Sequence, residues 1–228
     1  MSHDNASRRS VLSGVGAAIA GAFALGSTRL GAQAPSAGFQ PARHMQDDWL
    51  DQLPGRHRTF IDCATPNAAG AGLLYANNLF LANRSGYQLT DSDLAIVVCL
   101  RHFATVFAFN DAMWGKYGSA ISATVQFTDP RTRQAPATNV LNSTDYGTLL
   151  PNGGVSLSAL VQRGTHFAVC DMATRFITGQ VASAVKADAQ AIYKEFTSNM
   201  IPNSHAVAAG VVAVNRAQER GYTLLTAL

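Results

Sequence analysis

Short apolar runs alternate with longer amphipathic segments along most of this chain of 228 residues. The unbroken apolar run over residues 94–99 is typical of a strand that is buried on both faces, as in a parallel sheet. The same patterning and its glycine and proline stops predict four further strands, at 59–63, 165–169, 205–207 and 222–225, and helices at 70–85, 103–117, from 171, at 188–200 and at 211–220. Strands that alternate with helical crossovers predict an α/β fold, a three-layer α/β/α sandwich with a mainly parallel five-stranded sheet.

The first 34 residues have the pattern of a twin-arginine signal peptide. The run Ser7-Arg8-Arg9-Ser10-Val11-Leu12 precedes a weakly apolar stretch, rich in glycine and alanine, over residues 14–25. This stretch is too short and too rich in glycine for a typical spanning helix. We therefore expect export to the periplasm by the twin-arginine pathway, removal of the signal, and no stable membrane span afterwards.

The rest of the chain divides into an N-terminal arm, residues 35–58, and one domain, residues 59–228. Residues 119–155 interrupt the alternation of strands and helices with several prolines and a Gly-Gly pair, which indicates an insertion into the domain. A long connection of this kind is either a functional lid or a surface insertion. Val125 to Phe127 is its one candidate edge strand.

Charge excludes one class of partner. The whole chain has 17 basic and 14 acidic residues, but residues 1–34 hold Arg8, Arg9, Arg29 and Asp4, so 14 and 13 remain after their removal. A nearly neutral domain without a basic run is not expected to bind nucleic acid. The chain also has no G-x-S-x-G, Walker or dinucleotide motif, and we expect no cofactor.

The most informative segment is LVQRGTHFAVCDMATR, residues 160–175. Gly164 stands where a helix-ending glycine belongs, and Thr165 to Val169 form a short buried strand. Cys170 then lies at the carboxyl end of this strand, where parallel sheets hold their sites, and Asp171 is the expected N-cap of the next helix. A thiol beside the first amides of a helix is stabilised as the thiolate. The alternative is that Cys170 is a small buried apolar side chain.

All three cysteines, Cys63, Cys99 and Cys170, fall at the carboxyl ends of the first three predicted strands. If those strands are neighbours, the thiols share one edge of the sheet. That placement allows a disulfide, a metal site completed by His102, or a persulfide relay, but none of these has a diagnostic spacing. Three independent buried cysteines are the simpler alternative.

Three further side chains are candidates for the same edge. His102 follows the second strand and is a candidate base or metal ligand, while Arg101 and Arg175 are candidates for holding an anion such as a sulfur oxyanion. The alternatives are a histidine with satisfied hydrogen bonds and two structural ion pairs. His166 lies at the other end of its strand and is expected to be buried rather than catalytic.

Two stretches carry a resemblance to a known family. The run Arg163-Gly164-Thr165-His166-Phe167-Ala168-Val169-Cys170 and the ending from Ala208-Ala209-Gly210 through Ala217-Gln218-Glu219-Arg220-Gly221-Tyr222 resemble the DsrE/DsrF-like superfamily over roughly residues 59–225. The chain looks most like an exported subgroup of unclear function. The resemblance implies sulfur-relay chemistry with Cys170 as the persulfide carrier, and association into homo-oligomers.

Two functions of different classes therefore remain open. One is a non-catalytic binding or assembly protein, which uses the insertion and the arm as contact surfaces for a partner protein. The other is a periplasmic sulfur carrier or sulfurtransferase that forms a persulfide on Cys170 and takes sulfur from a small-molecule donor. An open cleft at Cys170 favours the second, and enclosure by apolar side chains favours the first.

Overall fold

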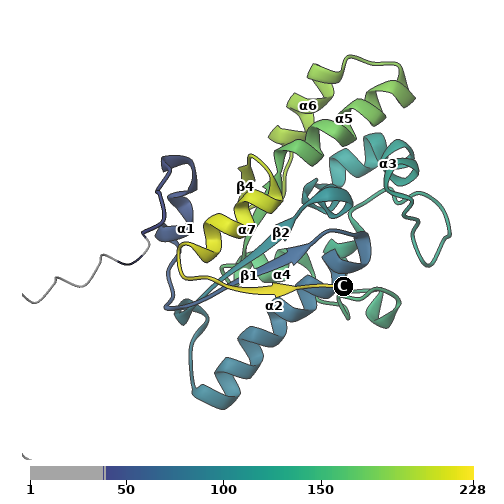
Figure 1. The fold of residues 1–228 in the computed structure, drawn as a ribbon. Coiled ribbons are helices and arrows are strands. Elements are labelled where there is room, and N and C mark those ends of the chain that lie inside the picture. Colours follow the sequence, from purple (N-terminus) through teal and green to yellow (C-terminus); the bar gives the residue numbers. More distant parts are fainter. Residues whose placement is uncertain (1–37, 39) are drawn as a thin grey trace, which may run out of the picture. The chain divides into compact units, whose positions relative to one another are not determined.

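Five parallel strands form one sheet in the order β4-β3-β2-β1-β5. Figure 1 labels β1, β2 and β4 of this sheet. The structure is a computed structural model and describes residue 38 and residues 40–228. The sheet belongs to the unit Pro41–Leu228. Its strands are β1 (His57–Cys63), β2 (Leu94–Leu100), β3 (His166–Cys170), β4 (Ser204–Val207) and β5 (Thr223–Thr226). The expected parallel sheet is confirmed, and its first three strands are neighbours.

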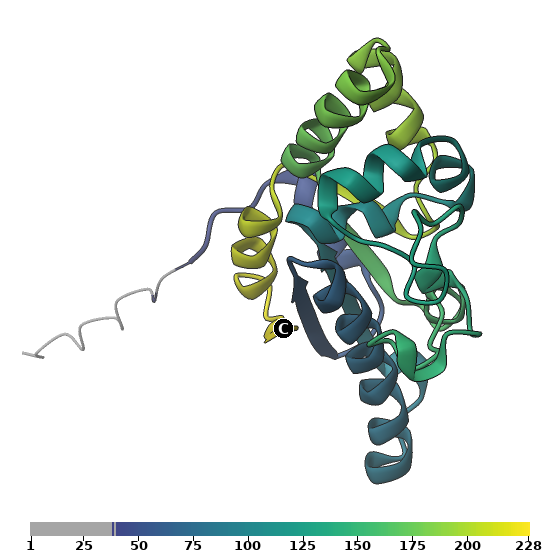
Figure 2. The ribbon, with the colours of Figure 1, turned by 90° about the vertical axis from the view of Figure 1, so that its right-hand side faces the viewer.

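Helices cover both faces of the sheet, which confirms the three-layer α/β/α architecture. One face packs against α2 (Pro66–Tyr87), α3 (Asp111–Val125), α4 (Leu157–Gln162), α5 (Asp171–Val185) and α6 (Ala189–Ser198). The other face packs against α1 (Trp49–Gln52) and α7 (Gly210–Gln218). Figure 2 shows α7 on one side of the sheet and α2 with α3 on the other. Every residue of β2 is buried, as its apolar run predicts.

The predicted helix at 103–117 is two elements. A 3-10 segment, η3 (His102–Ala108), follows β2, and α3 begins after Asn110, whose side chain accepts a hydrogen bond from the Met113 amide. Extended backbone at Asn110 and its hydrogen-bonding side chain start a new helix, so one continuous helix was a wrong prediction. The expected edge strand at Val125 to Phe127 is also wrong, because α3 extends to Val125 and Gln126 adopts the left-handed conformation (φ 52°).

The irregular segment between α3 and α4 is anchored to the core. It contains two 3-10 turns, η4 (Val140–Asn142) and η5 (Gly147–Leu149). The buried Asn139 amide donates to the carbonyl oxygens of Phe107 and Phe109 (2.8 and 2.9 Å). Val140 and Leu141 are buried in the main core. This part of the expected insertion therefore contributes to the fold.

Residues that precede the first strand also pack on the sheet. Leu50 is buried in the core on the α7 face. The fully buried side chain of Arg220 lies 3.1 Å from a carboxylate oxygen of Asp51 and 3.7 Å from one of Asp48. Because an unpaired buried guanidinium is costly, these carboxylates fasten α1 to the C-terminal part of the chain. Two further 3-10 turns are η1 (Met45–Asp47), which precedes α1, and η2 (Asp91–Asp93), which precedes β2.

The predicted signal peptide, residues 1–34, lies outside the described residues. Within residue 38 and residues 40–228, no helix has both the length and the apolar character that crossing a membrane requires.

Close packing between α2 and β1 generates a first prediction. A methyl group added at Gly72 would overlap the Sγ atom of Cys63, whereas one added at Gly86 on the same helix meets open space. We expect Gly72→Ala to lower the free energy of unfolding by about 1–3 kcal/mol, and Gly86→Ala to raise it by up to about 1 kcal/mol. Denaturant unfolding measures both. If Gly72→Ala is as stable as wild type, α2 does not approach β1 in this way.

A histidine pair joins β3 and β4 at the end of the sheet opposite to Cys170. Nδ1 of His166 and Nε2 of His205 lie 2.9 Å apart, and the His205 ring stacks on Trp49 with 3.9 Å between ring centroids. Burial lowers the pKa of His205 to about 4, with His166 as a further cause, and burial also lowers the pKa of His166. Both rings are therefore neutral in the folded protein near pH 7.

The second prediction is a loss of stability in mild acid. A histidine whose folded pKa lies below its ordinary 6.5 contributes stability above pH 6.5, which is lost as the pH falls toward about 4. We expect the free energy of unfolding to decrease across this window, and to decrease less in His205→Gln. The matched control is His57→Gln, at an exposed histidine on β1. Equal slopes for wild type and His205→Gln would contradict the burial of a neutral pair.

Candidate functional site

The carboxyl ends of β2, β3 and β4 border a cavity of about 360 Å³. Arg101 and His102 follow β2, Cys170 ends β3, Ala209 is the N-cap of α7, and Gly210 is the first residue of α7. Parallel α/β sheets place their ligands outside this edge. The sequence prediction that His102 and Arg101 border the same cleft as Cys170 is therefore confirmed.

Cys170 is itself the N-cap of α5. Its Sγ atom accepts a hydrogen bond from the Ala173 amide (3.4 Å), and Thr174 Oγ1 donates to its carbonyl oxygen (3.0 Å). The prediction that Asp171 caps this helix is wrong, because the extended backbone lies at Cys170 and Asp171 is already helical. The thiol is thus one residue closer to the helix amides than predicted. An amide donor and the positive end of a helix both stabilise negative charge on sulfur.

The side chain of Cys170 is 6% exposed, yet it lines the cavity. It forms only a small apolar cluster, with Ala173 and Ala209, and it is not part of either large core cluster. Met172, which also lines the cavity, is 67% exposed and does not enclose the thiol. The thiol therefore lies at the wall of an open cavity and not inside the main core.

Arg101 forms a two-pronged ion pair with Asp62 of β1. Its Nε and Nη2 atoms donate to the two carboxylate oxygens of Asp62 at 2.7 and 2.8 Å. These hydrogen bonds raise the pKa of Arg101, and Asp62 is 7% exposed. The carboxylate neutralises the guanidinium, so Arg101 provides little net charge for an external anion. The backbone of Gly210 touches the Arg101 side chain so closely that a Cβ there would overlap it.

His102 lines the cavity beside Arg101 and is exposed. Its backbone lies in the left-handed region (φ 51°), which histidine enters more readily than bulkier or β-branched residues do. Its ring is 4.2 Å from that of Phe103, measured between centroids. The cavity therefore has an exposed imidazole on the side of β2.

Arg175 does not line the cavity. Its Nε atom donates to Asp171 (2.7 Å) and its Nη2 atom to the hydroxyl of Tyr193 (3.0 Å), which in turn donates to Asp171. This arrangement is the structural ion pair that was the alternative interpretation, and it links α5 to α6. Arg175 is not placed to hold an anion at Cys170.

The three cysteines share the carboxyl edge but not one face. Cys63 packs in the core on the α2 face, whereas Cys99 packs on the α7 face, toward which Cys170 also points. All three are free thiols. Within the described residues, no group of three or more His, Cys, Asp or Glu side chains is placed to hold a metal ion. The structure does not bring Cys63, Cys99, Cys170 and His102 together as a metal site.

Sequence reasoning missed two parts of the site. The first is Asp62, although an acidic residue in the buried second half of a strand signals a buried partner. The second is an apolar rim from Phe103, Met172, Phe176 and Val211, which come from three elements. Met172 and Phe176 are four residues apart on α5, a spacing that places both on one face of a helix.

No protein-family model matches this chain, and no curated protein matches it. Among solved structures, it is similar to a protein of unknown function from Methanobacterium thermoautotrophicum. The two are 13% identical, with 75% of this chain and 99% of that chain covered and a TM-score of 0.38. A similarity at this level carries no argument about function.

The burial of the three thiols generates the third prediction. Cys63 and Cys99 are fully buried, and burial raises the pKa of both thiols, whereas Cys170 reaches the cavity. Because the thiolate is the reactive form, we expect iodoacetamide to modify Cys170 first in the folded protein. Peptide mass mapping over time measures the order, with the unfolded protein as the control in which the three rates converge. Faster labelling of Cys63 or Cys99 would contradict the proposed site.

Proposed function

We propose that this protein is a sulfur carrier that accepts sulfane sulfur on Cys170 as a persulfide. The observation that carries the proposal is the position of Cys170, which caps α5 and lines an open cavity. A merely structural cysteine needs neither an amide donor to sulfur nor access to a cavity. This proposal includes the DsrE-like relationship that the motif around Cys170 suggests.

The first turns of two helices supply the electrostatics of the proposed site. The first turn of α5 donates an amide hydrogen to Cys170 Sγ. The first turn of α7 lines the cavity with Gly210 and Val211, and its N-cap, Ala209, has no side chain to accept from its first amides. The positive ends of both helices favour a single negative charge at the cavity, which matches a thiolate or its persulfide.

In the proposed reaction, the Cys170 thiolate attacks the outer sulfur of a donor R–S–SH. A bond forms between Sγ and that sulfur while the S–S bond of the donor breaks, and its electron pair leaves with R–S⁻. The hydrogen stays on the transferred sulfur, so the product is Cys–S–SH and no further oxidant is required. The exposed His102 ring on the cavity wall is the proposed proton donor to the leaving thiolate.

The proposed place of action is the periplasm, because the twin arginines and the apolar stretch that follows them have the pattern of an export signal. A homo-oligomer, which the family resemblance implies, remains a prediction.

A non-catalytic binding or assembly function is the second candidate, and a specific observation favours it. Met172, Phe176 and Val211 are 67%, 54% and 58% exposed around the cavity. Large apolar side chains gathered on a surface mark contact sites for ligands or partner proteins. Sulfur uptake by Cys170 distinguishes the two candidates.

The fourth prediction tests this uptake. Incubation of the folded protein with sodium polysulfide should add the mass of one sulfur atom to the Cys170 peptide. Cys170→Ser should abolish the addition, whereas Cys99→Ala, at a fully buried thiol, should retain it. If Cys170 stays unmodified by polysulfide and by hydropersulfides while circular dichroism shows an intact fold, the sulfur-carrier function is wrong and the binding function takes its place.

A further inference from the structure

We infer that the cavity selects sulfur donors by charge and polarity, and takes an organic hydropersulfide whose non-reacting group is apolar and uncharged. This inference rests on the proposed function and specifies its substrate class. The inference is based on two features of the cavity: its apolar rim, and Arg101, whose charge Asp62 neutralises.

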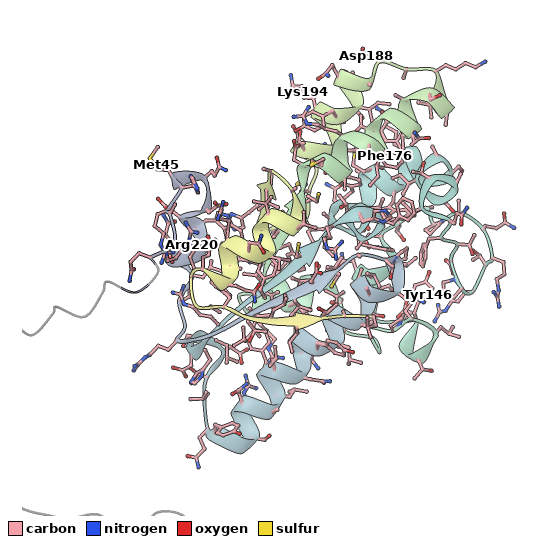
Figure 3. All side chains as sticks on the ribbon, in the orientation of Figure 1. Met45, Tyr146, Phe176, Asp188, Lys194 and Arg220 are labelled. Atoms are coloured by element: carbon pink, nitrogen blue, oxygen red, sulfur yellow. The ribbon has the colours of Figure 1, made fainter. Side chains whose placement is uncertain are left out.

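The walls of the cavity are apolar beyond the thiol. Phe103 lies on the side of β2, Met172 and Phe176 on α5, and Val211 on α7. Phe176 is labelled on α5 in Figure 3. An inorganic polysulfide or a carboxylate would lose hydration among these side chains without gaining hydrogen bonds, whereas an aryl or alkyl group gains from their contact.

The positive groups at the site can balance one negative charge. The positive ends of α5 and α7 face the thiolate, and the carboxylate of Asp62 occupies two of the nitrogen atoms of Arg101. Among the residues that line the cavity, His102 is the other basic side chain, and it lies exposed at the edge of the cavity. A donor with a second negative charge would therefore enter without a free permanent cation to pair with it.

The size of the cavity limits the apolar group. About 360 Å³ lies near the lower end of the roughly 300–1,000 Å³ of small-molecule sites. This space fits a phenyl ring or a short alkyl chain attached to the persulfide. Aromatic side chains at Phe103 and Phe176 favour a ring, since aromatic pairs attract one another beyond the area they bury.

The experiment compares two donors that differ only in this group, phenylmethyl hydropersulfide and 2-carboxyethyl hydropersulfide. The measured quantity is the initial rate of persulfide formation on Cys170, divided by the rate of each donor with a free cysteine derivative in solution. We expect the phenylmethyl donor to be favoured about tenfold, because burial of part of a phenyl group is worth about 1–2 kcal/mol.

Two variants on one helix provide the matched control. Phe176→Lys places a cation on the rim at a half-exposed position and should remove or reverse the preference. Val185→Lys adds the same charge at the other end of α5, outside the cavity, and should leave the preference unchanged. Asp62→Asn releases the guanidinium of Arg101 and should raise the rate of the carboxylated donor several-fold. If Asp62→Asn does not fold, the comparison of Phe176→Lys with Val185→Lys tests the inference.

The outcomes separate this inference from the proposed function. Equal normalised rates for the two donors, or a faster carboxylated donor in the wild-type protein, would overturn the inference while leaving Cys170 a sulfur carrier. A tenfold preference that changes equally in Phe176→Lys and Val185→Lys would also overturn it, because the rim would then not be the selecting surface. If Cys170 takes up sulfur from neither hydropersulfide and also not from polysulfide, the proposed function itself is wrong.

Discussion

The ion pair between Asp62 and Arg101 connects the parts of the molecule that form the site. Asp62 lies next to the end of β1, Arg101 follows β2, and the Arg101 side chain packs against the backbone of Gly210 at the start of α7. A buried carboxylate is tolerated only with a partner, and a two-pronged pair fixes the geometry of both side chains. The pair therefore fixes where β1, β2 and the first turn of α7 meet.

This constraint also determines the chemistry that the cavity can support. Because Asp62 neutralises the guanidinium, the main positive influences on Cys170 are the first turns of α5 and α7. These helix ends can stabilise one negative charge on Sγ of Cys170, which already accepts a hydrogen bond from an amide. In the proposed function, the apolar rim contacts the group that carries the sulfur. The positive helix ends beside Cys170 and the apolar rim both suit the proposed substrate, which carries one reactive sulfur on an apolar group.

Much of the fold was predictable, because periodicity reports burial directly. The apolar run of β2 and the Gly164 stop before β3 located both strands, and the placement of Cys170 at a strand end followed from them. The division of residues 103–117 was not predictable, since it depends on how Asn110 caps α3 and on how η3 packs.

The site was predictable in part, for a related physical reason. Strand ends bring Arg101, His102 and Cys170 to one edge, and their order along the chain indicates this. The partner of Arg101 and the partner of Arg175 depend on side-chain geometry across elements, which no spacing encodes. The same holds for the face to which Cys63 points, because a strand position gives the edge of the sheet but its register gives the face.

The most direct test of the central claim is a crystal structure of the protein after exposure to phenylmethyl hydropersulfide. The account predicts difference electron density for one additional sulfur atom bonded to Sγ of Cys170, inside the cavity between α5 and α7. Unmodified Cys170 in a crystal where the donor has been consumed, or an additional sulfur atom on Cys63 or Cys99 instead, would contradict it.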